Sequence, residues 1–144
     1  MTVEDLYRSL IEAWNARDAV AFEALFIVDG EVVGFDGSHI MGQGAIGEEM
    51  RKIFSDHPTN PYVTRIHGVT TVATDVAIVR AVAGMIPRGK TTFEPSLHAI
   101  QRLTAVQRGG AWRVALFQTT PALFHGRPEA VLALTRELAG ELPD

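Results

Sequence analysis

The chain has no cysteine among its 144 residues. This absence excludes a disulfide framework, a zinc or iron–sulfur site with cysteine ligands, and catalysis by a thiol nucleophile. Long apolar runs are missing as well, because no stretch approaches the roughly 20 residues that span a bilayer. Residues 1–5 are acidic and lack the basic region that opens a signal peptide. We therefore expect a cytoplasmic protein with no membrane partner.

Positive charge is also scarce. The chain has 13 Lys and Arg residues against 17 Asp and Glu residues, a formal net charge of −4. Nucleic-acid-binding domains carry a basic face, so we expect no nucleic-acid partner. The five histidines include no pair at i, i+4 spacing and no His-x-His, and the sequence has no P-loop, dinucleotide-binding or Gly-x-Ser-x-Gly motif. Neither a metal ion nor an organic cofactor is expected.

What the chain does contain is typical of a globular domain. Hydrophobic residues make up 47% and charged residues 21%, and the length suits one domain over residues 1–144. The first part has helical periodicity, since Leu6, Leu10 and Trp14 recur on one face behind a capping residue. Asp18 is expected to start a second, short helix with Phe26 on its apolar face. A third helix is expected over residues 45–55.

The rest of the chain has the composition of strands. Two short strands, 31–35 and 38–41, are joined by Asp36-Gly37, a strong hairpin signal. Segments rich in Val, Ile, Thr and aromatic residues then predict a meander of four long antiparallel strands over residues 62–73, 76–86, 93–107 and 111–119. A last helix is predicted over residues 128–139. The predicted fold class is α+β, with helices on one face of a curved, mostly antiparallel sheet.

Pairing arithmetic indicates which side chains face inward. A hairpin symmetric about Gly109-Gly110 places Gln101 beside Gln118 at one end of an otherwise apolar inner face. An apolar cavity with a few convergent polar groups is typical of a small-molecule site. The two glutamines are therefore candidate ligand-binding residues, although they can also bond only each other at the rim of the sheet.

The same arithmetic leaves Arg80 with two positions. Pairing Ile86 with Phe93 places Arg80 beside Ala99 on the inner face. There its guanidinium would bind an anionic or carbonyl oxygen of a ligand. A one-residue bulge turns Arg80 outward, where it would pair with an acid across a dimer. The next hairpin places His67 opposite Val82, which adds His67 to the candidates for the inner face.

Two segments carry a family resemblance. Residues 14–18, Trp-Asn-Ala-Arg-Asp, resemble the helical opening of the NTF2-like superfamily, and residues 110–121 with the Phe-His-Gly-Arg-Pro-Glu of 124–129 resemble its SgcJ/EcaC-type, SnoaL-like branch. That family is associated with enediyne and related bacterial natural-product biosynthesis. The resemblance implies a cone-shaped fold, an apolar pocket and a homodimer. Thr119 stands where the family pattern has asparagine, a departure that the predicted register places on the outer face.

The candidate site residues fall into two groups. Candidate ligand-binding residues are Trp14, Phe26, His67, Arg80, Gln101 and Gln118. Trp14 is either a core residue or a ligand platform. Arg127 is either part of a helix start or a clamp that anchors the tail onto the sheet or the partner subunit. A mixed outer face is expected to form the homodimer; its members are Arg102, Thr104, Arg113, Ala115 and Phe117.

Catalytic residues are not identified by the sequence. In the resemblance to ketosteroid isomerases, the oxyanion-hole tyrosine falls on Leu10 and the general base near Gly34, and neither residue transfers protons. Asp36, two residues away, is better explained as a turn residue. The apolar inner face predicts a protein that binds a hydrophobic small molecule, and the family resemblance implies that this molecule is polyketide-like. The alternatives are a cofactor-independent isomerase, cyclase or dehydratase, and a structural dimer whose cavity is filled by side chains.

Overall fold

The computed structural model describes residues 1–143. Helix α1 opens with a capping box between Thr2 and Asp5, and Asp18 caps α2 by accepting a hydrogen bond from the Ala21 amide. The elements in chain order are α1 (Val3–Asn15), α2 (Ala19–Ala24), β1 (Phe26–Val33), β2 (His39–Met41), α3 (Gln43–Asp56), β3 (Tyr62–Ala73), β4 (Val76–Met85), the short 3₁₀ helix η1 (Pro95–Leu97), β5 (Ala99–Arg108), β6 (Ala111–Pro121), η2 (Phe124–Gly126) and α4 (Pro128–Ala139).

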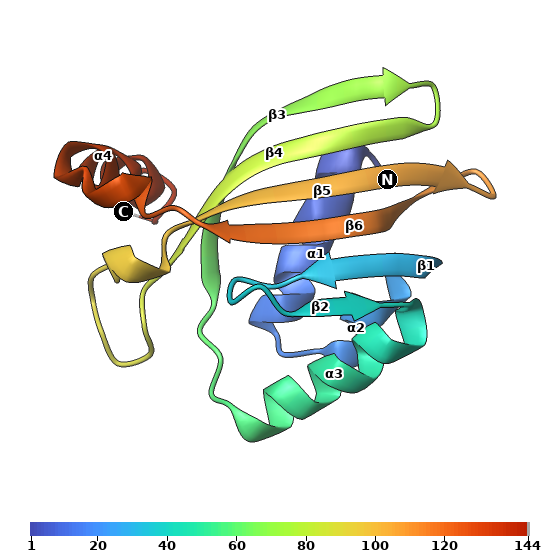
Figure 1. Cartoon of the computed structure of the whole chain (residues 1–144), viewed down its shortest axis with the longest axis horizontal. Coiled ribbons are helices and arrows are strands. Elements are labelled where there is room, and N and C mark those ends of the chain that lie inside the picture. Colours follow the sequence, from blue (N-terminus) through green and yellow to red (C-terminus); the bar gives the residue numbers. More distant parts are fainter. Residues whose placement is uncertain (144) are drawn as a thin grey trace.

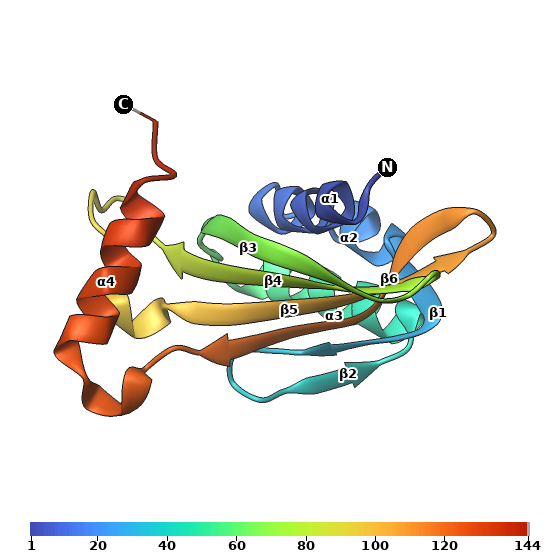
Figure 2. The ribbon, with the colours of Figure 1, turned by 90° about the horizontal axis from the view of Figure 1, so that it is seen from above.

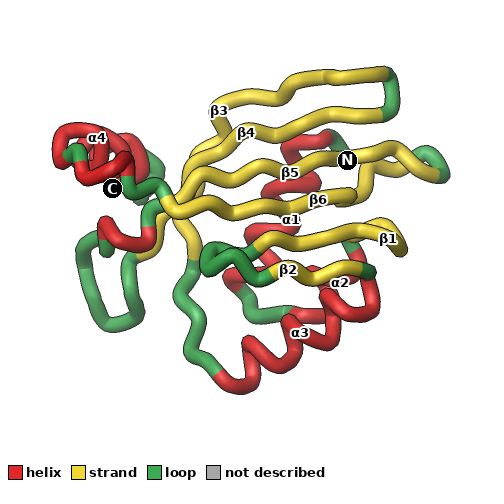
Figure 3. The backbone as a smooth tube through the Cα atoms, in the orientation of Figure 1, coloured by secondary structure: helices red, strands yellow, loops and turns green. Residues whose placement is uncertain are grey.

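The six strands, yellow in Figure 3, form one sheet in the order β2-β1-β6-β5-β4-β3 (Figures 1 and 3). The four long strands pair as the antiparallel meander that the sequence predicts, and β1 joins it by running parallel to β6. Pairing shifts interrupt β1 against β6, β3 against β4, and β5 against β6. Bulges of this kind bend strands and increase their twist, which curves the sheet. The predicted α+β class is confirmed.

Helices α1, α2 and α3 pack on the concave side of the sheet (Figures 1 and 2). The centre of this core contains fully buried side chains from both layers, among them Leu6 and Leu10 of α1, Ile46 of α3 and Leu103 of β5. Phe26 also lies in this core, as the first residue of β1 and not in a helix, because α2 ends at Ala24.

Helix α4 crosses the end of the sheet instead of joining the other helices (Figure 2). Its Leu134 and Leu138 form a second, smaller core with Val82 of β4. Two contacts join β3 to this region: Arg65 forms a salt bridge with Glu141, two residues after the end of α4, and Nε2 of His67 lies 2.5 Å from a carboxylate oxygen of Glu137 in α4. The convex face of the sheet is otherwise uncovered by helices of the described residues.

The predicted pairing of Gln101 with Gln118 is wrong. Pairing follows the prediction from Gln107 to Ala105 and then shifts by one residue at Ala115, so that Gln101 lies opposite Thr119 and Gln118 lies opposite Arg102. The shift moves Phe117 and Thr119 to the buried inner face and Gln118 to the outer one. Residues 114–117 are all apolar, so the alternation of apolar and polar residues that normally sets the strand register is absent there.

The predicted inward register of Arg80 is also wrong. Strand β5 begins at Ala99 and not at Phe93, so Arg80 pairs with Arg102 and not with Ala99. Its exposed side chain lies over Gly68 on the outer face, so close that a Cβ at Gly68 would come within 2.5 Å of Nη2. Two register shifts between β3 and β4 put Arg65, not His67, opposite Val82. His67 is exposed and faces α4.

His98, which lies between η1 and β5, is fully buried. Its Nε2 lies 2.7 Å from Oγ1 of Thr135, whose hydroxyl donates to the Val131 carbonyl oxygen. The Thr135 oxygen therefore accepts from Nε2–H, and Nδ1 has no hydrogen-bond partner among the described residues. Burial lowers the pKa of His98, an effect that Glu94 partly opposes.

We expect this histidine to make folding stability depend on pH. The unfolded chain binds the His98 proton more readily than the folded chain, so the free energy of unfolding is highest above pH 6.5 and falls as the pH drops toward the lower folded pKa. Urea titrations between pH 7.5 and 5 measure the loss. The His98→Gln variant should lose less stability over this range than the native chain, and an equal loss in both would assign the pH dependence to other groups.

Candidate functional site

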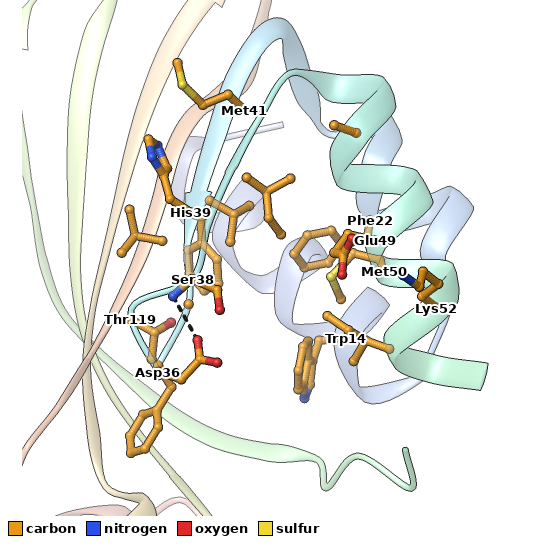
Figure 4. Close-up of a pocket in the computed structure, with 18 of the residues that line it drawn as sticks. Trp14, Phe22, Asp36, Ser38, His39, Met41, Glu49, Met50, Lys52 and Thr119 are labelled. Carbon is orange, nitrogen blue, oxygen red and sulfur yellow. Dashed lines mark hydrogen bonds between the residues drawn. The ribbon is translucent and has the colours of Figure 1, made fainter. Parts of the chain in front are cut away.

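A cavity of about 1010 Å³ lies between the β1–β2 hairpin, the sheet, the end of α1 and the inner side of α3 (Figure 4). This volume is sufficient for a drug-sized organic molecule. Most of its wall is apolar or aromatic; the residues of that kind are Trp14, Phe22, Val32, Val33, Phe35, Ile40, Met41, Ala45, Met50, Ile53, Tyr62 and Phe117. Side chains therefore do not fill this cavity. A purely structural role would require a filled one.

The Trp-Asn-Ala-Arg segment at the end of α1 contributes Trp14 to the cavity wall and fixes its surroundings. Trp14 donates its Nε1–H to the Asn60 carbonyl oxygen at 2.9 Å and packs on Tyr62 with ring centroids 5.4 Å apart. Asn15 bonds both backbone polar groups of Tyr62, at 3.1 and 2.8 Å. Arg17 donates to the carbonyl oxygens of Phe54 and His57 at the end of α3. The motif thus fixes α1, α3 and the start of β3 relative to one another.

A buried polar chain runs through the floor of the cavity. Tyr7 donates its hydroxyl to Oε1 of Gln101 at 2.6 Å, and Nε2 of Gln101 donates to the Thr119 hydroxyl at 3.4 Å. Thr119 and Tyr62 line the cavity, whereas Gln101 is fully buried behind them. Burial raises the pKa of Tyr62 to about 12, although nearby Thr119 and Gln101 lower it slightly. At neutral pH the floor thus offers uncharged hydroxyl groups.

Charged side chains surround the opening. Asp36 and Ser38 come from the β1–β2 hairpin, and Glu48, Glu49 and Lys52 come from α3. Asp36 accepts a hydrogen bond from the Ser38 amide at 2.9 Å, which lowers the pKa of its carboxyl group. A carboxylate with a lowered pKa is a weak base, and a tyrosine with a raised pKa is a weak acid. Neither Asp36 nor Tyr62 is therefore tuned for proton transfer near neutral pH.

The structure brings together only part of the predicted set. Trp14 lines the cavity, and Gln101 reaches it through Thr119. Phe26 stacks in the core on Phe22, whose ring is one of the lining groups. The three other candidates lie outside the cavity: His67 toward α4, and Arg80 and Gln118 on the outer face.

Several lining residues carry no signal for a site in the sequence. The predicted register places Thr119 on the outer face because nothing in the sequence indicates the bulge at Ala115. Tyr62 only begins a predicted strand, and Glu48 and Glu49 are exposed residues of α3 that also border the opening. Asp36 is the turn residue that its Asp-Gly pair predicted and a lining residue as well. A position at the rim of a cavity has the same polarity as any exposed position, so composition gives no signal for it.

The tail segment 124–129 lies away from the cavity. Arg127 donates its Nε–H to the Phe124 carbonyl oxygen at 3.0 Å, and its guanidinium lies 6.0 Å from the centre of the Phe124 ring. Pro128 then begins α4, with Glu129 in the first turn. Arg127 thus fastens the turn that starts the helix, as the helix-start alternative for this residue predicts.

Comparison with known proteins establishes the fold. No protein-family model and no curated protein matches the sequence. Among solved structures, a domain of unknown function from Nostoc punctiforme with a cystatin-like fold superposes with a TM-score of 0.76 at 20% identity, covering 97% of this chain and 98% of that one. A ketosteroid isomerase-like protein from Erwinia carotovora atroseptica gives 0.67 at 20% identity, with coverages of 83% and 93%.

A third similar structure is an NTF2-like protein of unknown function from Shewanella oneidensis, with a TM-score of 0.63 at 14% identity and coverages of 82% and 95%. The chain therefore has the NTF2-like, or cystatin-like, fold. At these identities the likeness concerns the fold, and the fold hosts many functions. No group of three or more His, Asp or Glu side chains that could hold a metal ion occurs in residues 1–143, and no helix there is long and apolar enough to cross a membrane.

Proposed function

We propose that the protein binds a hydrophobic small molecule in the cavity beneath the β1–β2 hairpin. The observation that carries this proposal is the cavity itself, a volume of about 1010 Å³ with aromatic and aliphatic walls and the Thr119 and Tyr62 hydroxyls on its floor. Such a site holds an apolar skeleton by burial and orients one neutral polar group by hydrogen bonding. The resemblance of residues 110–129 to the SgcJ/EcaC-type family suggests that the ligand is an intermediate of bacterial natural-product biosynthesis.

Loss of the floor hydroxyl tests this proposal. We expect Thr119→Val to weaken binding of 2-naphthylmethanol, a neutral aromatic alcohol, by about fivefold to tenfold, because one hydrogen bond contributes on the order of 1 kcal/mol. Thr104→Val is the matched control, since Thr104 lies on the outer face of the same sheet. Isothermal titration calorimetry measures both affinities. Equal effects of the two substitutions, or none, would remove Thr119 from the site.

We propose further that the uncovered convex face joins two copies of the chain. Half-exposed apolar side chains, including Ile78 of β4, Val106 of β5 and Leu116 of β6, share this face with the exposed guanidinium groups of Arg80 and Arg102. A two-fold axis lets the apolar side chains of one copy cover those of the other while the arginines stay solvated at the rim. Phe117, which was predicted to belong to this surface, is buried inside the molecule.

Sedimentation velocity at micromolar concentration tests the assembly. The native chain is expected to sediment as a dimer, and Ile78→Glu is expected to sediment as a folded monomer because it buries a carboxylate in the contact. Leu132→Glu, on the exposed side of α4, is the control and should remain dimeric. A native chain that sediments as a monomer would contradict this part of the proposal.

A further inference from the structure

The charges at the cavity opening are unequal. Asp36, Glu48 and Glu49 contribute three carboxylates, and Lys52 contributes one ammonium group. The described lining contains no arginine. Arg80, the anion-binding residue that the sequence suggested, lies on the outer face. The field at the opening is therefore negative, and it repels a ligand carboxylate as it enters.

Two of the carboxylates lie on opposite sides of the opening. In Figure 4, Asp36 lies beside Thr119 on the hairpin side, whereas Glu49 lies with Phe22 and Met50 on the side of α3. The Ser38 amide fixes the Asp36 carboxylate at 2.9 Å and favours its ionised form. A cationic group at the opening would thus meet negative charge from both walls.

The aromatic lining suits the same ligand charge. Trp14, Phe22, Phe35, Tyr62 and Phe117 all border the cavity. The indole N–H of Trp14 is already donated to a backbone oxygen, so this side chain offers a ligand its ring and not a donor. Aromatic ring faces attract ammonium groups and gain nothing from carboxylates.

We propose that the cavity selects hydrophobic amines in their ammonium form over carboxylates of the same size and shape. The inference rests on the proposed binding function and names the ligand class for it. The apolar skeleton of the ligand lies among the aromatic side chains, and its ammonium group lies at the opening between Asp36 and Glu49. Because these carboxylates are exposed, the preference is modest, on the order of tenfold at low ionic strength, and salt reduces it.

Three probes with one ring system test this selectivity: 2-naphthylmethylamine, which is protonated at pH 7, 2-naphthylmethanol, and 2-naphthoic acid, which is ionised. Calorimetric titration at pH 7 and low salt should give the tightest binding for the amine and the weakest for the acid, with about a tenfold ratio between them. In the Asp36→Asn/Glu49→Gln double variant the amine-to-acid ratio should fall toward one.

Glu129→Gln is the matched control, because it removes a carboxylate from α4, far from the opening. It should keep the full amine-to-acid ratio. Binding of the alcohol together with equal affinities for the amine and the acid would overturn the selectivity and leave the binding function standing. An equal drop in ratio for Glu129→Gln would also overturn it, because the preference would then follow net charge alone. If none of the three probes binds, the proposed function fails and the selectivity with it.

Discussion

Ile53→Trp is expected to abolish binding of 2-naphthylmethanol, with a loss of about 100-fold or more in affinity, equivalent to about 2.7 kcal/mol. Ile53 is half-buried on the inner side of α3 and lines the cavity, so an indole at this position occupies the space of the ligand's rings. The protein should stay folded, because the added volume enters an open cavity and not a packed core. Calorimetric titration measures the affinity, and circular dichroism verifies the fold.

Leu132→Trp provides the control for this substitution. Leu132 is 49% exposed on α4, outside the cavity, so an indole there should leave the affinity unchanged. If the Ile53→Trp protein is folded and binds as tightly as the native chain, the ligand lies elsewhere.

Tyr7→Phe is expected to lower the free energy of unfolding by about 1–3 kcal/mol. The Tyr7 side chain is 1% exposed, and its hydroxyl is the donor to Oε1 of fully buried Gln101. Removal of the hydroxyl leaves this amide oxygen without that bond and away from water, so the folded state bears its desolvation cost. Urea denaturation followed by circular dichroism measures the change.

A double-mutant cycle separates this hydrogen bond from simple packing. Gln101→Leu removes the acceptor, and in the Tyr7→Phe/Gln101→Leu protein the two side chains are both apolar. The double variant should therefore lose less stability than the two single variants added together. Strictly additive losses would mean that Tyr7 and Gln101 do not stabilise each other.

Much of the fold could be predicted from the sequence because local signals agreed with one another. The capping box at Thr2, the glycine turn at Gly109-Gly110 and Pro128 at the start of α4 each mark a boundary that the structure confirms. Strand β3 and helix α4 have the predicted bounds. These features depend on residues that are close in sequence, where capping and turn chemistry act directly.

The register of the sheet could not be predicted from the sequence in the same way. Ala115 shifts the pairing of β6 within an unbroken apolar segment. That one residue places Thr119, instead of Gln118, on the inner face. Residues 93–98, which the strand prediction included, form a loop with η1, and Phe93 packs toward α4. Both errors arise from contacts between distant parts of the chain. The same cause hid most of the cavity, since Tyr62, Thr119 and Glu49 meet only after folding.

The location of a bound ligand tests the central claim most directly. Amide ¹H–¹⁵N spectra recorded during titration with 2-naphthylmethanol report which residues sense the ligand. We expect saturable shifts at Ser38, Ile53 and Thr119, which line the cavity, and at the Trp14 indole N–H, while Arg102 and Thr104 on the outer face stay unchanged. Shifts confined to the outer face, or no saturable shift at a cavity residue, would contradict the claim that this cavity is the binding site.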